Sequence, residues 1–295
     1  MCNNRNLSRM LFLVLYLFCI LCFIPGIVFS APIDLQLGAR PQALGGAFVA
    51  LSDDSDAIWW NPAGLSLQRT AEISFMHQLM AEFNFVYIDS LGFTKPIGRG
   101  GIGLGWFRVG AQLKEGIENK ASSMSENIFT LGYGISLVEN VRIGIIFKRL
   151  TLDSVVGSGA GFGFDIGGLW KIKNIFSIAL VFRNVATDVK NESFPSTMRI
   201  GFAWRIFKDR LRLAFDVDTK DDINSKKGVS YRWHTGLECE IKKVFCIRLG
   251  ADVGNFAIGF GLNFPRWRAD YAFLSRSSLS SLHRIALSLK FGDTK

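Results

Sequence analysis

The sequence predicts an all-β protein, a transmembrane antiparallel β-barrel of about 14 strands with a short helical N-terminal plug in the lumen. The chain of 295 residues is 49% hydrophobic, with a mean hydropathy of +0.24. After residue 30, however, no stretch reaches the roughly 18 uncharged apolar residues that a membrane helix needs. From Arg69 onward, apolar and polar residues alternate with a period of two, as in strands with one face toward lipid. A stretch rich in small residues, Gly38 to Leu65, comes first and predicts the plug.

Residues 1–30 have the pattern of a secretory signal peptide. Two arginines precede an uninterrupted apolar run from Met10 to Ile24, and a Pro-Gly pair ends the run shortly before the small residue Ser30. This order predicts export, with cleavage after Ser30. The alternative is a membrane anchor that extends to Phe29. The chain is thus divided into a signal peptide over 1–30, a plug over 31–68 and a barrel over 69–295.

The first part of the plug predicts a helix from Pro41 to about Leu51. Proline suits a first helical position, because the N–H that it lacks has no partner there. Small residues then share one helix face: Ala43, Gly46, Ala47 and Ala50. Two adjacent glycines inside a helix cost roughly 1 kcal/mol each. Gly45 and Gly46 therefore indicate that a strand or another backbone approaches very closely.

The second part of the plug predicts a short helix that carries Trp59 and Trp60. Ser55 and Asp56 are candidate N-caps, and the turn residues Asn61-Pro62 and Gly64 follow the helix.

Three aspartates, Asp53, Asp54 and Asp56, lie between the two predicted helices. They invite a calcium interpretation, but their spacing lacks the glycine and the distal glutamate of an EF-hand loop. We expect capping and pairing with the barrel wall, and no metal.

Several short motifs of the plug resemble one known family. They are Gly38-Ala-Arg, Gly45-Gly46-Ala, Asp53-Asp54 and Trp60-Asn61-Pro62-Ala63-Gly64-Leu65. Together, over about 28 residues, they look like the N-terminal hatch of the FadL-like outer-membrane barrels, most closely of the PorV/PorQ branch. The resemblance implies a fourteen-stranded barrel with the hatch folded into its lumen. It also implies a ligand or plug role for Gly45, Gly46, Asp53, Asp54, Trp59, Trp60, Asn61, Pro62 and Gly64.

The alternating segments specify which side chains face lipid. In one of them, Met198, Ile200, Phe202, Trp204 and Ile206 share a face, and Arg199, Gly201, Ala203 and Arg205 share the other. We expect the apolar face to point outward. The segments begin near residues 71, 84, 100, 126, 141, 161, 175, 196, 210, 229, 245, 255, 267 and 282.

The links between segments alternate in length. Long links are expected at 113–125, 153–160, 186–195, 219–228 and 275–283, and short ones in between, with Val253-Gly254 as a short exception. Bacterial barrels have short periplasmic turns and longer extracellular loops. The pattern therefore places both mature termini in the periplasm of a diderm bacterium.

Glycines recur at strand spacing from Gly157 to Gly163. No Lys-Ser/Thr pair or helix follows, so a phosphate loop is not favoured. We expect a glycine-lined wall against which the plug lies, or a strand kink.

Charges of both signs are predicted on the lumen face. The candidate residues are Arg199, Arg205, Arg212 and Arg232, with several acids near them. One interpretation is a network that braces the wall and anchors the plug aspartates. The other is a polar conduit or a site for a carboxylate ligand.

The predicted mature chain keeps two cysteines, Cys239 and Cys246. A three-residue turn at 242–244 would place Cys239 on the lipid face and Cys246 on the lumen face. A two-residue turn would make them direct partners.

Composition and motifs exclude several classes of function. Three histidines without metal or catalytic spacing predict no enzyme, no metal and no cofactor. Without the two signal-peptide arginines the net charge is +9 − 2 = +7, but the aromatic residues follow the lipid face, so nucleic acid is not an expected partner.

Passage of hydrophobic small molecules such as long-chain fatty acids across the outer membrane is the function that the resemblance implies first. A PorV-type accessory or shuttle component of type IX secretion is the alternative. The expected partners are outer-membrane lipid and either a hydrophobic ligand or secreted protein clients.

Overall fold

The computed structural model describes residues 37–80, 86–113, 122–154, 157–189, 192–193, 196–221, 229–275 and 281–292. The predicted signal peptide and its cleavage position lie outside these residues. Within them, no helix has both the length and the hydropathy needed to cross a bilayer.

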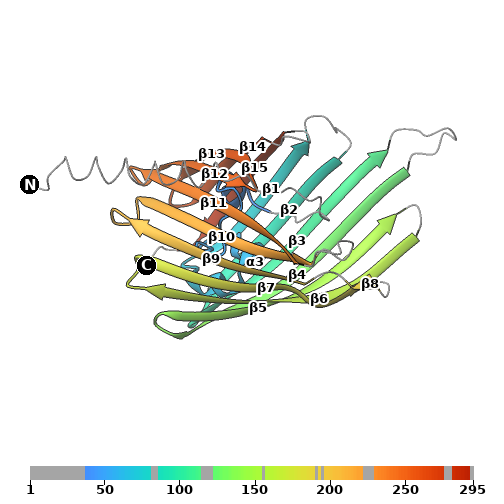
Figure 1. Cartoon of the computed structure of the whole chain (residues 1–295), viewed down its shortest axis with the longest axis horizontal. Coiled ribbons are helices and arrows are strands. Elements are labelled where there is room, and N and C mark those ends of the chain that lie inside the picture. Colours follow the sequence, from blue (N-terminus) through green and yellow to red (C-terminus); the bar gives the residue numbers. More distant parts are fainter. Residues whose placement is uncertain are drawn as a thin grey trace, which may run out of the picture.

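The strands form one closed antiparallel barrel, as predicted (Figure 1). Closure comes from two pairings, β1 with β15 and β6 with β7. A two-residue strand, β8, pairs only with the end of β7, which leaves fourteen long strands in the ring. The strands are β1 (Ala71–Met80), β2 (Val86–Ile97), β3 (Gly100–Leu113), β4 (Ser122–Val138), β5 (Val141–Ser154), β6 (Gly157–Ile172), β7 (Phe176–Val189), β8 (Glu192–Ser193), β9 (Thr197–Ile206), β10 (Leu211–Asp221), β11 (Val229–Ile241), β12 (Phe245–Asp252), β13 (Asn255–Asn263), β14 (Trp267–Leu274) and β15 (Leu282–Phe291).

The predicted faces are confirmed. On β9, Trp204 is 52% exposed on the outside of the barrel, whereas Arg199 on the lumen side is 1% exposed. On β6, Phe162 and Phe164 point outward, and the intervening Gly163 is buried. Large apolar side chains thus cover the outer wall, as they do in barrels that lie in lipid.

One predicted long link is wrong. The segment 153–160 was expected to be a loop, but β5 continues to Ser154 and β6 begins at Gly157. The two strands remain paired from Ser154 and Gly157 down to Val141 and Trp170. The ladder needs only backbone hydrogen bonds, so it continues where the outward side chains turn polar, as at Asp153.

Most of the short turns lie at one end of the barrel, and the turn at 253–254 is the expected exception at the other end. The turns at the first end include 98–99, 139–140, 173–175, 242–244 and 264–266. Ala71 at the start of β1 pairs with Phe291 at the end of β15, so both ends of the barrel sequence lie at this same end. We call it the short-turn end.

The turn between β11 and β12 has three residues. Ile241 pairs with Phe245, which sets Cys246 opposite Glu240 and Cys239 opposite Ile247. Both thiols are free, with Cys246 buried and Cys239 partly exposed. The three-residue alternative is therefore the one that the structure adopts.

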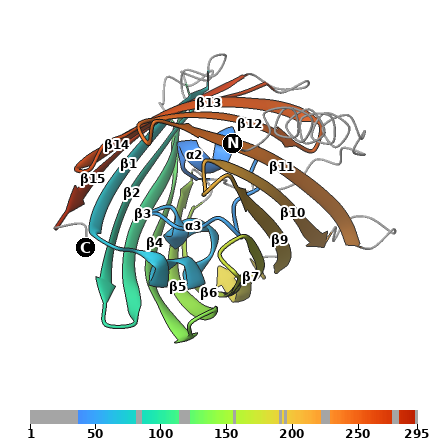
Figure 2. The same ribbon diagram turned by 90° about the vertical axis from the view of Figure 1, so that its left-hand side faces the viewer.

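The plug lies inside the barrel (Figure 2). It contains α2 (Ala39–Ala43), α3 (Ala57–Trp60) and the 3-10 helix η1 (Pro62–Leu67). The predicted helix to Leu51 is wrong, since α2 ends at Ala43. Gly45 and Gly46 have φ angles of 62° and 82°, so the glycines end the helix and reverse the chain.

The predicted caps are also corrected. Asp56 is the N-cap residue of α3, but its side chain makes no capping hydrogen bond. Asn61 has this role for η1, since its side chain accepts a hydrogen bond from the N–H of Ala63 at 3.0 Å.

Candidate functional site: the plug and the lumen wall

The plug backbone lies directly on glycines of the wall. A Cβ at Gly45 would overlap the backbone of Ala251 on β12, which is the close approach expected from the sequence. A Cβ at Gly134 or Gly144 would overlap Pro62, and one at Gly101 would overlap Leu65. Side chains at these positions would push the plug off the wall.

The sequence predicted that the glycine run from Gly157 to Gly163 either lines a wall against the plug or marks a strand kink. A Cβ at Gly163 would meet Thr187 of β7, not the plug, whereas Gly167 farther along β6 contacts Asn61 and Pro62. The pairing of β6 with β7 is irregular between Phe162 and Ile166. The kink alternative therefore describes this run better.

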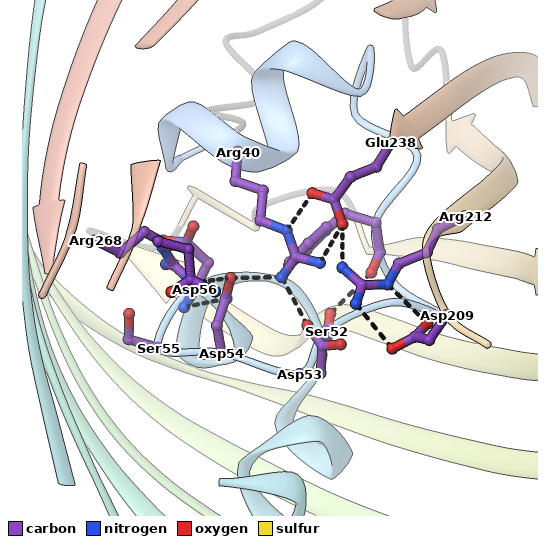
Figure 3. Close-up of polar contacts among 12 residues, drawn as sticks. Arg40, Ser52, Asp53, Asp54, Ser55, Asp56, Asp209, Arg212, Glu238 and Arg268 are labelled. Atoms are coloured by element: carbon purple, nitrogen blue, oxygen red, sulfur yellow. Dashed lines mark hydrogen bonds and ion pairs between the residues drawn. The ribbon is translucent and has the colours of Figure 1, made fainter. Parts of the chain in front are cut away.

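Arg40 joins the plug to the wall (Figure 3). Its guanidinium is buried and donates to Glu238 of β11 through Nε at 2.8 Å and Nη2 at 2.9 Å. Its Nη1 donates to Asp53 at 2.6 Å and to Asp54 at 2.7 Å. One arginine thus ties α2 to the aspartate segment and to the barrel.

Glu238 and Asp54 extend this cluster into the wall. Glu238 also accepts from Arg248 at 2.6 Å and from Arg212. Asp54 accepts from Arg268 at 2.8 Å. Four guanidiniums from the plug and three strands therefore share two buried carboxylates, in a region where an unpaired charge is costly.

A second polar cluster holds the turn after α2. Arg199 donates to Asp218 and, at 3.1 Å, to the carbonyl of Gly46. Asp216 accepts from the backbone N–H groups of Phe48 and Val49 at 2.9 and 3.1 Å. These contacts satisfy plug backbone groups that have no helical partner.

All four arginines proposed from the sequence lie on the lumen face. Arg199 and Arg212 belong to the clusters above, and Arg232 donates to Asp218 at 2.9 Å. Arg205 donates to Ser177 at 2.6 Å. Arg40 was missed, although it stands in the Gly38-Ala-Arg motif and is the only arginine between residues 37 and 68.

Trp60 and Asn61 form the centre of the plug. Trp60 is buried, its Nε1 donates to the carbonyl of Leu37 at 2.7 Å, and Phe48 packs edge-on with ring centroids 5.8 Å apart. Asn61 Nδ2 donates to the carbonyl of Val49 at 2.9 Å. A Cβ at Gly64 would overlap Ser52, so this glycine lets two plug segments meet.

An apolar stripe lines the opposite side of the lumen. Leu37, Met76, Ile88 and Phe107 form one buried cluster on β1, β2, β3 and the start of the plug. Trp59, Val109, Ile128 and Ala286 pack against it. The lumen is therefore two-sided, with this stripe on β1–β4 and the buried charges mainly on β9–β14.

The pKa values of two neighbouring buried aspartates shift in opposite directions. For Asp56, burial and the nearby carboxylates of Asp54, Asp270 and Glu72 raise the pKa well above its usual range. For Asp54, burial also favours the neutral form, but Arg268 and Arg40 outweigh it and lower the pKa. Within the described chain, no group of three or more His, Cys, Asp or Glu side chains is arranged to hold a metal ion.

These two shifts predict opposite mutant effects. Asp54 contributes stability at pH values above the pKa of aspartate in the unfolded chain, about 3.9. This contribution is lost as the pH falls through the lower pKa that Asp54 has in the folded protein. The contribution of Asp56 is fully present below about pH 3.9 and is lost as pH rises through its raised folded pKa. At neutral pH we therefore expect Asp54→Asn to lower the urea midpoint and Asp56→Asn to leave it unchanged or raise it. Equal losses in both variants, measured by urea unfolding across pH, would contradict this assignment.

Comparison with protein families matches residues 25–202 to the Uncharacterised protein family (UPF0164). This is more than half of the chain. The chain belongs to this family. No curated protein matches it.

Solved structures give the fold of this UPF0164 member. The CymD monoaromatic hydrocarbon channel has a TM-score of 0.70 and 12% identity, over 90% of this chain and 100% of that one. The toluene transporter TbuX of Ralstonia pickettii has a TM-score of 0.66 and 13% identity, over 88% and 100%. A Pseudomonas aeruginosa FadL homologue has a TM-score of 0.59 and 10% identity, over 90% and 99%. The chain thus has the fold of FadL-like outer-membrane transporters.

Proposed function

We propose that this protein is an outer-membrane channel for hydrophobic small molecules, with its short-turn end and both termini in the periplasm. The apolar stripe that ends at Trp59 carries the proposal. Apolar side chains on a lumen wall have no role in stabilising a water-filled pore, whereas they suit the uptake of an apolar molecule. The solved structures with this fold include proteins described as hydrocarbon channels and toluene transporters.

Trp59 is placed to control the path. It is partly buried, whereas its neighbour Trp60 is 1% exposed, and its ring lies against Gly105 of β3. A ligand that moves along the stripe would contact this ring together with Leu37 of the plug. The Trp59 side chain is not part of the ion pairs that Arg40 makes with Asp54 and Glu238.

A polar group in the stripe tests the path. The protein is reconstituted into liposomes, and a hydrophobic fluorescent probe is added to the outside. We expect the Phe107→Gln variant to take up this probe more slowly than the wild type. An unpaired amide in an apolar site costs about 1–3 kcal/mol, which predicts uptake slower by roughly tenfold. Phe107→Leu keeps the surface apolar and is the matched control, with a rate near that of the wild type. Equal rates for Phe107→Gln and the wild type would exclude this stripe as the path.

The cargo is tested by mass spectrometry of what stays bound after gentle detergent extraction from the native membrane. Stoichiometric fatty acid would identify long-chain acids as the cargo within this proposal. A recurrent exported protein without such lipid would instead favour the PorV-type secretion accessory that the hatch motif of Trp60 to Leu65 brings into consideration.

A further inference from the structure

An apolar groove lies on the outer wall, away from the lumen path. It has a volume of about 610 Å³ and crosses β11 to β15 near the short-turn end. The outward side chains that line it are Ile241, Phe245, Ile247, Phe260, Leu262, Ala269, Tyr271 and Ile285.

The strand register explains why the groove exists. Ala269 pairs with Leu262 on one side and with Leu287 on the other, and the adjacent outward position on β14 is Tyr271. A single methyl group therefore stands among large side chains. The outer wall is therefore hollowed at Ala269 and higher around it, a shape that fits a flexible hydrocarbon chain.

Cations stand at the mouth of this groove. Lys242 and Lys243 are the first two residues of the turn between Ile241 and Phe245, which both line the groove. Arg266 lies in the next turn, three residues before Ala269. All three are exposed, and within the described residues none has an ion-pair partner. Glu240 points instead into the lumen, toward Arg212 at 3.6 Å.

An aromatic pair marks the level of the membrane interface. Phe264 and Trp267 stack with ring centroids 4.5 Å apart, directly beside Arg266. Tryptophan prefers the headgroup level of a bilayer. The cations therefore lie at the headgroups, and Ala269, two residues beyond Trp267 on the same face, lies among the acyl chains.

We propose that this face holds an anionic glycerophospholipid, with its headgroup at Lys242, Lys243 and Arg266 and an acyl chain in the groove at Ala269. Charge complementarity selects this occupant. A second copy seated symmetrically on the same face would bring these like charges together, which is unfavourable. A zwitterionic lipid would fill the groove equally well, but its ammonium group would offset its phosphate, so it would bring no net negative charge to the three cations.

Native mass spectrometry of the detergent-solubilised protein tests the site, with phosphatidylglycerol and phosphatidylethanolamine of identical acyl chains added in equal amounts. We expect the wild type to retain phosphatidylglycerol preferentially. Lys242→Gln and Lys243→Gln should each reduce this preference about fivefold, the value typical of one cation beside an anionic surface. Ala269→Phe should abolish the retention of both lipids, because the ring fills the groove.

Two matched controls separate the site from general effects. Lys173→Gln removes an exposed lysine from the β6–β7 turn, and Ile143→Phe enlarges an outward side chain on β5. Both should retain phosphatidylglycerol like the wild type, and heat-modified gel migration checks that every variant is folded. A wild type without preference, an equal loss in Lys173→Gln, an unchanged Ala269→Phe or a dimer in place of bound lipid would each overturn the proposal.

Discussion

Replacing Glu238 with glutamine is expected to lower the free energy of unfolding by about 3–5 kcal/mol, the usual cost of leaving buried charges without their partner. Glu238 accepts from Arg40, Arg248 and Arg212, and its side chain is 1% exposed. Glutamine keeps the shape but removes the charge that balances these guanidiniums. The plug should loosen, so urea unfolding in detergent should shift and ion conductance in a planar bilayer should rise.

Glu240→Gln is the matched control. Glu240 lies two residues away on the same strand and also faces the lumen. Among the described residues it has one ion pair, with Arg212 at 3.6 Å, and its side chain is 17% exposed. A single contact at this distance is weaker than the three short contacts of Glu238, so Glu240→Gln should cost clearly less than Glu238→Gln. If Glu240→Gln cost as much as Glu238→Gln, general charge would explain the loss, and the Arg40 cluster would not.

A double mutant tests whether Arg40 is the partner that matters. Arg40→Met removes the buried plug charge, so Arg40→Met together with Glu238→Gln should cost less than the sum of the single changes. Full additivity would contradict the direct pairing of plug and wall.

Gly167→Val is expected to have the second largest effect, because valine has no room between β6 and the plug. A Cβ at Gly167 would overlap Asn61 and Pro62, the residues that begin η1. Overpacking of this kind costs about 1–3 kcal/mol. We expect proteolytic cleavage of the plug to become faster and the conductance to rise, since the plug must move away from the wall.

Gly168→Val provides an adjacent comparison on the same strand. Its Cβ would point outward, with the nearest heavy atom, the carbonyl oxygen of Leu180, 3.9 Å away. Any gain in strand propensity is shared by both variants, so the difference between them isolates contact with the plug. Similar conductance for the two variants would show that the plug does not rest on Gly167.

The direction of the side chains on β9 could be predicted from the sequence, whereas the end of α2 could not. Alternation along β9 was sufficient to place Trp204 outside and Arg199 inside, because side chains of a strand point alternately to its two faces. The predicted end of the first plug helix was wrong, because two adjacent glycines are compatible either with a helix that packs closely against a strand or with a reversal of the chain. The positive φ angles at Gly45 and Gly46 decide for the reversal.

The sequence by itself determined the barrel, the direction of its side chains and a plug rich in small residues, since these depend on periodicity and composition along the chain. Only the tertiary structure decided which residues the plug contacts. Arg40 and Glu238 are separated by 198 positions, and Gly167 of β6 lies directly against Asn61 of the plug. Such contacts depend on how fourteen strands close into a ring, and no local pattern records which distant strand faces a given plug residue.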